Sequence, residues 1–166
     1  MSKEFYIRAF ERKDVQEAIA VWNQVVEAGN AFPQTEPLEE ESGTAFFEEQ
    51  SYTAVAVCKD KETVAGLYIL HPNNIGRCGH ICNASYAVRE DLRGLHVGEM
   101  LVRDCLERAR SLGFRILQFN AVVRSNTAAL SLYEKLGFIR LGVIPGGFRM
   151  KDGHYEDIWP YYHVIS

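Results

Sequence analysis

The spacing of apolar residues along the chain predicts a series of strands and helices. Residues 4–9 alternate polar and apolar side chains, which is typical of a half-buried strand. From Val15 to Val26 apolar side chains recur every three or four residues, as on the buried face of a helix, and Gly29 is placed to end it. By the same criteria we expect a loop at 30–37, helices at 38–50, 97–112 and 126–136, and strands at 52–58, 63–71, 79–88, 115–122, 138–144 and 157–164.

The order of these elements, β-α-α-β-β-β-α-β-α-β-β, alternates strands with helices only in its second half. This order favours an α/β (α+β) fold, with a mixed sheet and helices on both faces, over a uniform parallel sheet.

Two further predictions concern single residues. Asp14 and Glu17 have the spacing of a capping box at the start of the first helix. Pro160 predicts that the last strand is an edge strand or is interrupted there.

Composition narrows the class of protein. The 166 residues are 47% hydrophobic and 24% charged, which suits one domain spanning 1–166. A net charge of -4 gives no electrostatic reason to expect nucleic acid or a membrane as a partner. No apolar run approaches the roughly 20 residues of a membrane span, and the charged, alternating N-terminus is unlike a signal peptide. Four cysteines without a secretory signal therefore indicate reduced thiols and a cytoplasmic location.

The segment YAVREDLRGLHVGEML joins a strand that ends near Val88 to a helix that starts near Val97. Such a helix start exposes unpaired N–H groups and favours anions. Gly94 and Gly98 would let the backbone approach an anion closely, and Arg93 could add charge-assisted hydrogen bonds to a diphosphate. On its own the segment is equally well a plain connection with a solvated arginine, because it lacks both the dinucleotide fingerprint and the Walker lysine.

A second segment, from Ser125 to Phe138, opens a helix with Asn126 and closes it at Gly-Phe. The small side chains of Ala128 and Ala129 would let a ligand pack closely against this helix. Tyr133 comes seven residues after Asn126, which is about two helical turns, so the two side chains share a face.

Together the two segments resemble the GNAT superfamily of acetyl-CoA-dependent N-acetyltransferases, through R-x-x-x-x-G at a strand–helix junction followed by N-x-A-A-x-x-x-Y-x-x-x-G-F. The resemblance is strongest over residues 79–142. It implies a GNAT-like, mainly antiparallel sheet of six to seven strands, splayed near its centre, with about four helices on both faces. Within the superfamily, the segments FPQTEP, HPNNIGRCGHICNASYAV and FNAVVRSN are similar to the azetidine-2-carboxylate and proline-analogue acetyltransferases.

The resemblance also implies which residues hold acetyl-CoA, the expected co-substrate. In the superfamily, backbone at the end of the fourth strand meets the pantetheine arm and the acetyl group, and the next turn wraps the pyrophosphate. These roles fall here on Ala87, Val88, Arg93, Gly94, Leu95, His96, Val97 and Gly98. His96 departs from the pattern, which has glycine at its position. Because backbone N–H groups do the binding, we expect a weakened but working motif, with an imidazole that either reaches the cofactor or faces solvent.

Asn126, Ala129 and Tyr133 are expected beside the same co-substrate. Asn126 resembles the asparagine that hydrogen-bonds the pantetheine arm, and it could also cap its helix. Tyr133 resembles the tyrosine that acts as general acid toward the leaving thiolate, the alternative being a core aromatic. Direct transfer is expected rather than a cysteine acyl-enzyme, because no cysteine has a motif setting.

Two asparagines, Asn83 and Asn120, stand in strands otherwise rich in apolar residues. In the superfamily fold these strands are neighbours that splay at the acetyl site. We therefore expect both side chains to face the acceptor and bind its carboxylate or amine, with Asn120 also a candidate catalytic residue; the alternative is a pair that bridges the strands. Phe32, in the proline-bearing 30–37 loop, would close over a small acceptor.

The general base is not singled out by the sequence, and a water relay is one solution. The candidate side chains are Glu27, Glu36, His71, His80 and His154. Cys78, His80 and Cys82 alternate and would share one face of a strand. In a strand such side chains lie roughly 6–7 Å apart, too far to converge on one ion, so no metal is expected.

We therefore predict an acetyl-CoA-dependent acyltransferase that acetylates the amine of a small molecule, an amino acid or an analogue, with toxic proline analogues among the candidates. A protein N-terminal or lysine acetyltransferase and a non-catalytic acyl-CoA-binding sensor are the alternatives. Dimerisation is common in the superfamily, and the apolar segment IWPYYHVI could contribute to a homodimer.

Overall fold

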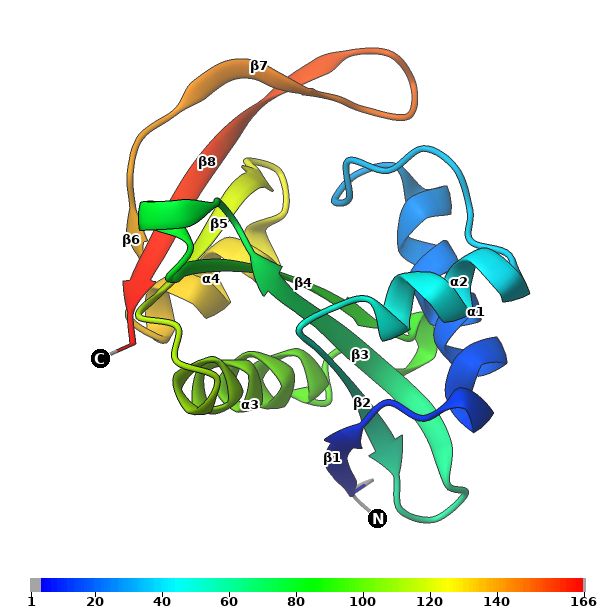
Figure 1. Cartoon of the computed structure of the whole chain (residues 1–166). Helices are drawn as coiled ribbons and strands as arrows, with labels where there is room; N and C mark the ends of the chain where they lie inside the picture. The colour runs from blue at the N-terminus through cyan, green and yellow to red at the C-terminus, as the bar shows by residue number, and fades with distance from the viewer. Residues whose placement is uncertain (1–3, 166) are drawn as a thin grey trace.

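In the computed structural model, which describes residues 4–165, eight strands form one open sheet with two helices packed on each face (Figure 1). The strands are β1 (Phe5–Ala9), β2 (Tyr52–Cys58), β3 (Thr63–Pro72), β4 (Ile81–Val88), β5 (Ile116–Val123), β6 (Ile139–Arg140), β7 (Ile144–Arg149) and β8 (Tyr155–Val164). The helices are α1 (Val15–Ala28), α2 (Glu40–Glu48), α3 (Val97–Ser111) and α4 (Thr127–Lys135). Residues 1–3 and 166, at the two ends of the predicted 1–166 domain, lie outside the described residues.

The sheet is splayed near its centre. The strands follow the order β1-β2-β3-β4-β5-β8-β6, with β7 also paired to β8. Across residues 4–165 every pairing is antiparallel except that of β4 with β5, which covers only Ile81 with Ile116 and Cys82 with Leu117. Beyond Cys82 the backbone of β4 has no ladder partner in β5. The expected mixed, mainly antiparallel and splayed sheet is confirmed.

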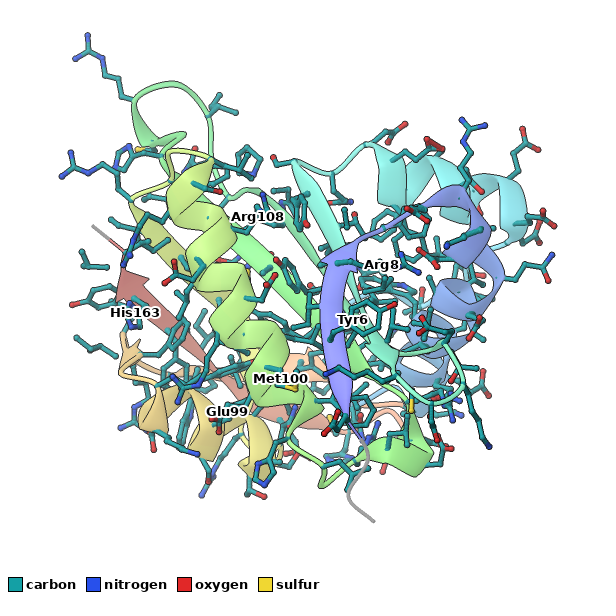
Figure 2. The ribbon with its side chains drawn as sticks, turned by 90° about the horizontal axis from the view of Figure 1, so that it is seen from below. Tyr6, Arg8, Glu99, Met100, Arg108 and His163 are labelled. Carbon is teal, nitrogen blue, oxygen red and sulfur yellow. The ribbon has the colours of Figure 1, made fainter. Side chains whose placement is uncertain are left out.

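The two faces of the sheet carry separate apolar cores. On one face α1 packs its predicted stripe against β2 and β3, and the ring of the fully buried Trp22 lies 4.3 Å from that of Phe32. On the other face α3 and α4 cover the sheet, with Leu101 of α3 fully buried. Figure 2 looks onto this second face, where Glu99 of α3 lies beside α4. Glu99 Oε1 forms an ion pair with Lys135 Nζ at 2.6 Å. These packings confirm helices on both faces.

The predicted capping box of α1 is wrong. The carboxylate of Asp14 accepts two hydrogen bonds from the Arg8 guanidinium, at 2.7 and 2.8 Å, and one from the N–H of Glu11 at 2.8 Å. Glu17 instead accepts from the N–H of Val64 at 2.8 Å. Asp14 thus bonds the backbone three residues before it and the preceding strand, and Glu17 bonds β3, so neither side chain caps the start of α1.

The predicted strand at 138–144 is two strands, β6 and β7, which makes eight strands in the described chain instead of the six or seven expected. Both pair with β8, and the break lies opposite Pro160, which has no N–H to donate to a ladder. The pairing of β8 with β5 also shifts register there, between Phe119 and Val122. Since β8 has neighbours on both sides, Pro160 marks an interruption and not a sheet edge.

The apolar C-terminal segment is partly buried within the chain. Ile158, Tyr161 and Ile165 are buried in its own cores. A homodimer therefore stays a prediction. In the described part of the chain, no helix combines the length and the apolar character that crossing a bilayer requires.

Candidate functional site

Three connected hollows lie at the splayed part of the sheet and beside it. We call the first the inner cavity, about 170 Å³ between β4, β5 and the 30–33 segment. The second, the turn groove, of about 610 Å³, runs along the start of α3 and the start of α4. The third, the hairpin groove, of about 840 Å³, lies between the 30s loop and the β7–β8 hairpin. Ala31, Tyr86 and Asn126 line both the inner cavity and the turn groove, so these two hollows meet there.

The turn groove is shaped by the backbone before α3. Leu92 and Val97 are buried and fix the turn to the core, whereas Arg93 and His96 between them are exposed. His96 has φ 65° and ψ 17°, in the left-handed region that glycine adopts without cost and other residues rarely occupy. His96 therefore differs from the glycine of the family pattern in its side chain only. Its backbone has the conformation that glycine favours at this position.

This turn offers a set of unused hydrogen-bond donors. No described residue supplies an acceptor for the backbone N–H groups from Gly94 to Gly98. Unpaired N–H groups at a helix start carry partial positive charge, and the guanidinium of Arg93 lines the same groove. This donor set fits a phosphate group.

Most of the residues expected at the donor substrate line the turn groove. They are Val88, Arg93, Gly94, His96, Val97, Gly98 and Asn126. Two others do not. Ala87 is buried on the α1 side among apolar residues, and Leu95 is exposed outside both hollows. Any contact of these two with a ligand in the groove would have to come from their backbone.

The inner cavity lies where β4 and β5 diverge, and it brings together residues from four segments of the chain. It is lined by the three residues predicted at the acceptor and by three of those predicted at the donor substrate: Phe32, Asn83 and Asn120, and Asn126, Ala129 and Tyr133. Its described lining contains no charged side chain. The cavity is therefore neutral, with amide groups as its main polar surface.

Tyr133 packs as a core aromatic and also presents its hydroxyl to the inner cavity, so its two predicted alternatives are compatible. Its ring packs in the core, with centroids 4.4 Å from Phe119 and 5.5 Å from Phe138. Burial raises the pKa of the Tyr133 hydroxyl above its usual value, so the phenol is protonated at neutral pH. Since that hydroxyl makes no hydrogen bond to another described residue, its proton is available to a ligand in the inner cavity.

Asn83 and Asn120 both line the cavity and bridge strands, so the two alternatives coexist. Asn83 Nδ2 donates to the carbonyl oxygen of Gln118 at 2.8 Å, across the splay. Asn120 Nδ2 donates to Oδ1 of Asn73 at 2.7 Å, and Asn120 Oδ1 accepts from Gln118 Nε2 at 3.1 Å. A primary amide has two N–H groups and two lone pairs, so each side chain keeps bonding capacity for a ligand.

None of the candidate general bases lines the inner cavity. Glu27 lines the hairpin groove and pairs with Lys151 at 3.4 Å. Hydrogen bonds to Glu156 and Asp152 raise the pKa of His154 in the hairpin. Glu36, His71 and His80 line neither the inner cavity nor the turn groove. A water relay stays a prediction.

The alternating Cys78, His80 and Cys82 do not share a strand face, which corrects that premise. Cys78 ends a short 3-10 turn, and β4 begins only at Ile81. Cys82 is buried and its thiol donates to the Ile116 carbonyl oxygen at 3.3 Å. Within residues 4–165 no cluster of three His, Cys, Asp or Glu side chains is arranged to hold a metal ion.

Among the residues of the site that sequence reasoning missed, three have a clear place in it. Tyr86 and Ala31 line the junction of the two hollows, and Asn73 bonds Asn120. One signal for Tyr86 exists, since it lies two residues before Val88 and so on the same face of the strand. Ala31 and Asn73 lie in connections, where no periodicity indicates which way a side chain points.

Comparisons with known proteins point to one family. The sequence profile of the acetyltransferase (GNAT) family matches residues 19–138. The N-acetyltransferase aca1 of Schizosaccharomyces pombe is 37% identical over 109 residues, covering 64% of this chain and 52% of aca1, so the chain spans about half the length of that relative. YwnH of Bacillus subtilis, whose assignment as a phosphinothricin acetyltransferase is unproven, is 26% identical over 153 residues, covering 90% of this chain and 93% of YwnH.

A solved structure of a GNAT-type acetyltransferase has the same fold as this chain. The GCN5-related N-acetyltransferase from Kribbella flavida superposes with a TM-score of 0.88 and 32% identity, covering 96% of this chain and 97% of that one. The chain belongs to the GNAT family of acetyltransferases.

Proposed function

We propose that this protein transfers acetyl from acetyl-CoA directly to the amine of a small molecule, an amino acid or an amino-acid analogue. The observation that carries the proposal is the meeting of the turn groove with the inner cavity at Ala31, Tyr86 and Asn126. A groove with phosphate-binding donors thus opens into a small neutral cavity lined by amides. Two reactants that enter from the two sides would meet at this junction, which is what acyl transfer between bound substrates needs.

The donor substrate would lie along the turn groove. The N–H groups of Gly94 to Gly98 and the Arg93 guanidinium would hold its pyrophosphate, and Asn126 would bond the pantetheine arm while it caps α4. The unpaired edge of β4 beyond Cys82 leaves backbone groups that can bond the arm and polarise the thioester carbonyl. His96 would contribute through its backbone.

In the transfer step the amine nitrogen forms a bond to the thioester carbon and the carbon–sulfur bond breaks. The sulfur leaves with the electron pair and takes the proton of the Tyr133 hydroxyl, which burial keeps protonated. The proton lost by the amine passes to water, since the inner cavity is lined by no carboxylate or imidazole among the described residues. A water-borne proton then restores the phenol.

The size and polarity of the inner cavity favour a small acceptor over a protein substrate. At about 170 Å³ it suits one amino-acid-sized molecule. Asn83 and Asn120 could donate to a carboxylate and accept from an ammonium group, which fits a zwitterion without fixed charges in the wall. Phe32 would cover the bound acceptor, because its ring is held against Trp22 at the cavity rim. The short segments similar to proline-analogue acetyltransferases make such analogues the first acceptors to test.

The test measures the free CoA thiol that is released from acetyl-CoA, with a reagent that becomes coloured when it reacts with a thiol. The acceptor panel contains proline, azetidine-2-carboxylate, primary amino acids, phosphinothricin and two peptides, one offering its N-terminal amine and one a lysine. We expect saturable turnover with at least one small acceptor and none with the peptides. Turnover only with a peptide, or tight CoA binding without any turnover, would reject the proposal in favour of a protein acetyltransferase or a sensor.

A further inference from the structure

Asn73, in the connection between β3 and β4, bonds Asn120 of β5, a residue that lines the inner cavity. The backbone N–H of Asn73 donates to the Ile81 carbonyl oxygen at 2.8 Å, which fixes it beside the start of β4. Its side-chain Oδ1 accepts from Nδ2 of Asn120 at 2.7 Å. Because β4 lies between β3 and β5, this bond spans an intervening strand and joins residues 47 positions apart.

This bond helps to fix which way the Asn120 amide points. Asn120 Nδ2 faces the accepting oxygen of Asn73, and Asn120 Oδ1 faces the donating Nε2 of Gln118 at 3.1 Å. A half-turn of the Asn120 amide alone would set oxygen against oxygen and N–H against N–H, so the amides of Asn73, Asn120 and Gln118 can turn only together. One N–H and one lone pair of Asn120 then remain in a defined direction at the inner cavity.

We propose that Asn73 is a positioning residue, which acts on the acceptor by orienting the amide of Asn120. Asn73 itself does not line the inner cavity, so its influence on a ligand there passes through Asn120. The ligand class that senses this orientation is an amine whose carboxylate or ammonium group bonds the Asn120 amide. The inference rests on the proposed function, because it needs Asn120 to touch the acceptor.

A double-mutant cycle on the acetyl transfer reaction tests this role. The variants are Asn73→Ala, Asn120→Ala, the double variant, and Asn73→Asp, which keeps an accepting oxygen at position 73. The matched control is Asn74→Ala, since the Asn74 side chain accepts only from the adjacent Ile75 N–H at 2.8 Å and lines none of the three hollows. Steady-state kinetics with the best acceptor give KM for both substrates and kcat for each variant.

We expect Asn73→Ala to lower kcat/KM for the acceptor about 3- to 10-fold, the size of one lost orienting hydrogen bond, while the KM for acetyl-CoA stays unchanged. The same substitution should have no further effect once Asn120 is alanine, because the bond is already lost. Asn73→Asp should recover most of the acceptor kcat/KM, and Asn74→Ala should match the unchanged chain.

Three results would overturn the inference. These are acceptor kinetics of Asn73→Ala equal to those of the unchanged chain, an equal loss in the Asn120→Ala background, or a parallel rise of the acetyl-CoA KM with a lowered melting temperature. The last would mark Asn73 as a structural residue only. An unchanged chain that turns over no amine overturns the proposed function, and the inference with it, whereas an active chain that does not respond to Asn73→Ala overturns the inference alone.

Discussion

Replacing His96 separates the backbone of the turn from its side chain. At φ 65° a residue with a Cβ destabilises the folded state by about 1–2 kcal/mol. Glycine removes this strain, but it also makes the unfolded chain more flexible, which lowers the stability by about 0.5–1 kcal/mol. His96→Gly should therefore raise the free energy of unfolding by about 0.5–1 kcal/mol, which for a chain of this size raises the melting temperature by about 1–4 °C. His96→Ala keeps the disfavoured φ and should bring no gain.

The same two variants report on the donor substrate. If the N–H groups from Gly94 to Gly98 carry the binding, the acetyl-CoA KM of both variants stays within about 3-fold of the original, since neither removes an N–H group. Thermal melts and steady-state kinetics on the same preparations measure both effects. Gly94→Ala, at φ +82°, is the control and should lower the melting temperature. The reasoning is refuted if His96→Gly melts below His96→Ala, or if both variants raise the acetyl-CoA KM by more than about 10-fold, a loss that only a charged or bonded imidazole would explain.

Three further predictions concern the reacting hydroxyl and the core. Tyr133→Phe should lower kcat by at least about 10-fold with an unchanged acetyl-CoA KM and melting temperature, as steady-state kinetics and a thermal melt can measure. Gly66→Ala should lower the free energy of unfolding by about 1–3 kcal/mol, because the added Cβ would lie 2.8 Å from the Ala87 carbonyl oxygen. Urea denaturation measures this loss, and Gly142→Ala is the control because its added Cβ would meet open space. Burial alone would raise the pKa of Asp14, but hydrogen bonds from Arg8 and the Glu11 N–H hold it below its usual 3.8. Asp14 should therefore stabilise the fold fully above pH 3.8, and the stability difference from Asp14→Asn should shrink as the pH falls through the lowered pKa of Asp14.

Elements set by local periodicity could be predicted from the sequence. The stripe from Val15 to Val26 needs only one apolar partner surface to form a helix, and Gly29, at φ 65°, ends it in the left-handed conformation. The predicted Asn126 cap is present, since its Oδ1 accepts from the Ala129 N–H at 3.3 Å. In these cases the decisive interaction joins residues a few positions apart.

Features decided by distant partners could not be predicted in this way. The predicted capping box is absent because the Asp14 carboxylate bonds Arg8 of β1 and Glu17 bonds the Val64 N–H of β3. The break between β6 and β7 depends on Pro160, a residue on the opposite strand. The sequence indicated Asn83 and Asn120 as unusual strand residues but not their partners, because those bonds exist only once β4 and β5 lie side by side.

The short pairing of β4 with β5 makes the stability of the fold depend on what fills the gap. Among residues 4–165, only two register pairs join the β1–β4 half of the sheet to the half containing β5 and β8. A ligand that bonds the unpaired edge of β4 stabilises the native chain by mass action, about 2.7 kcal/mol at 100 times its dissociation constant. Supply of such a ligand in solution would then regulate how long the folded chain survives, as well as how fast it works.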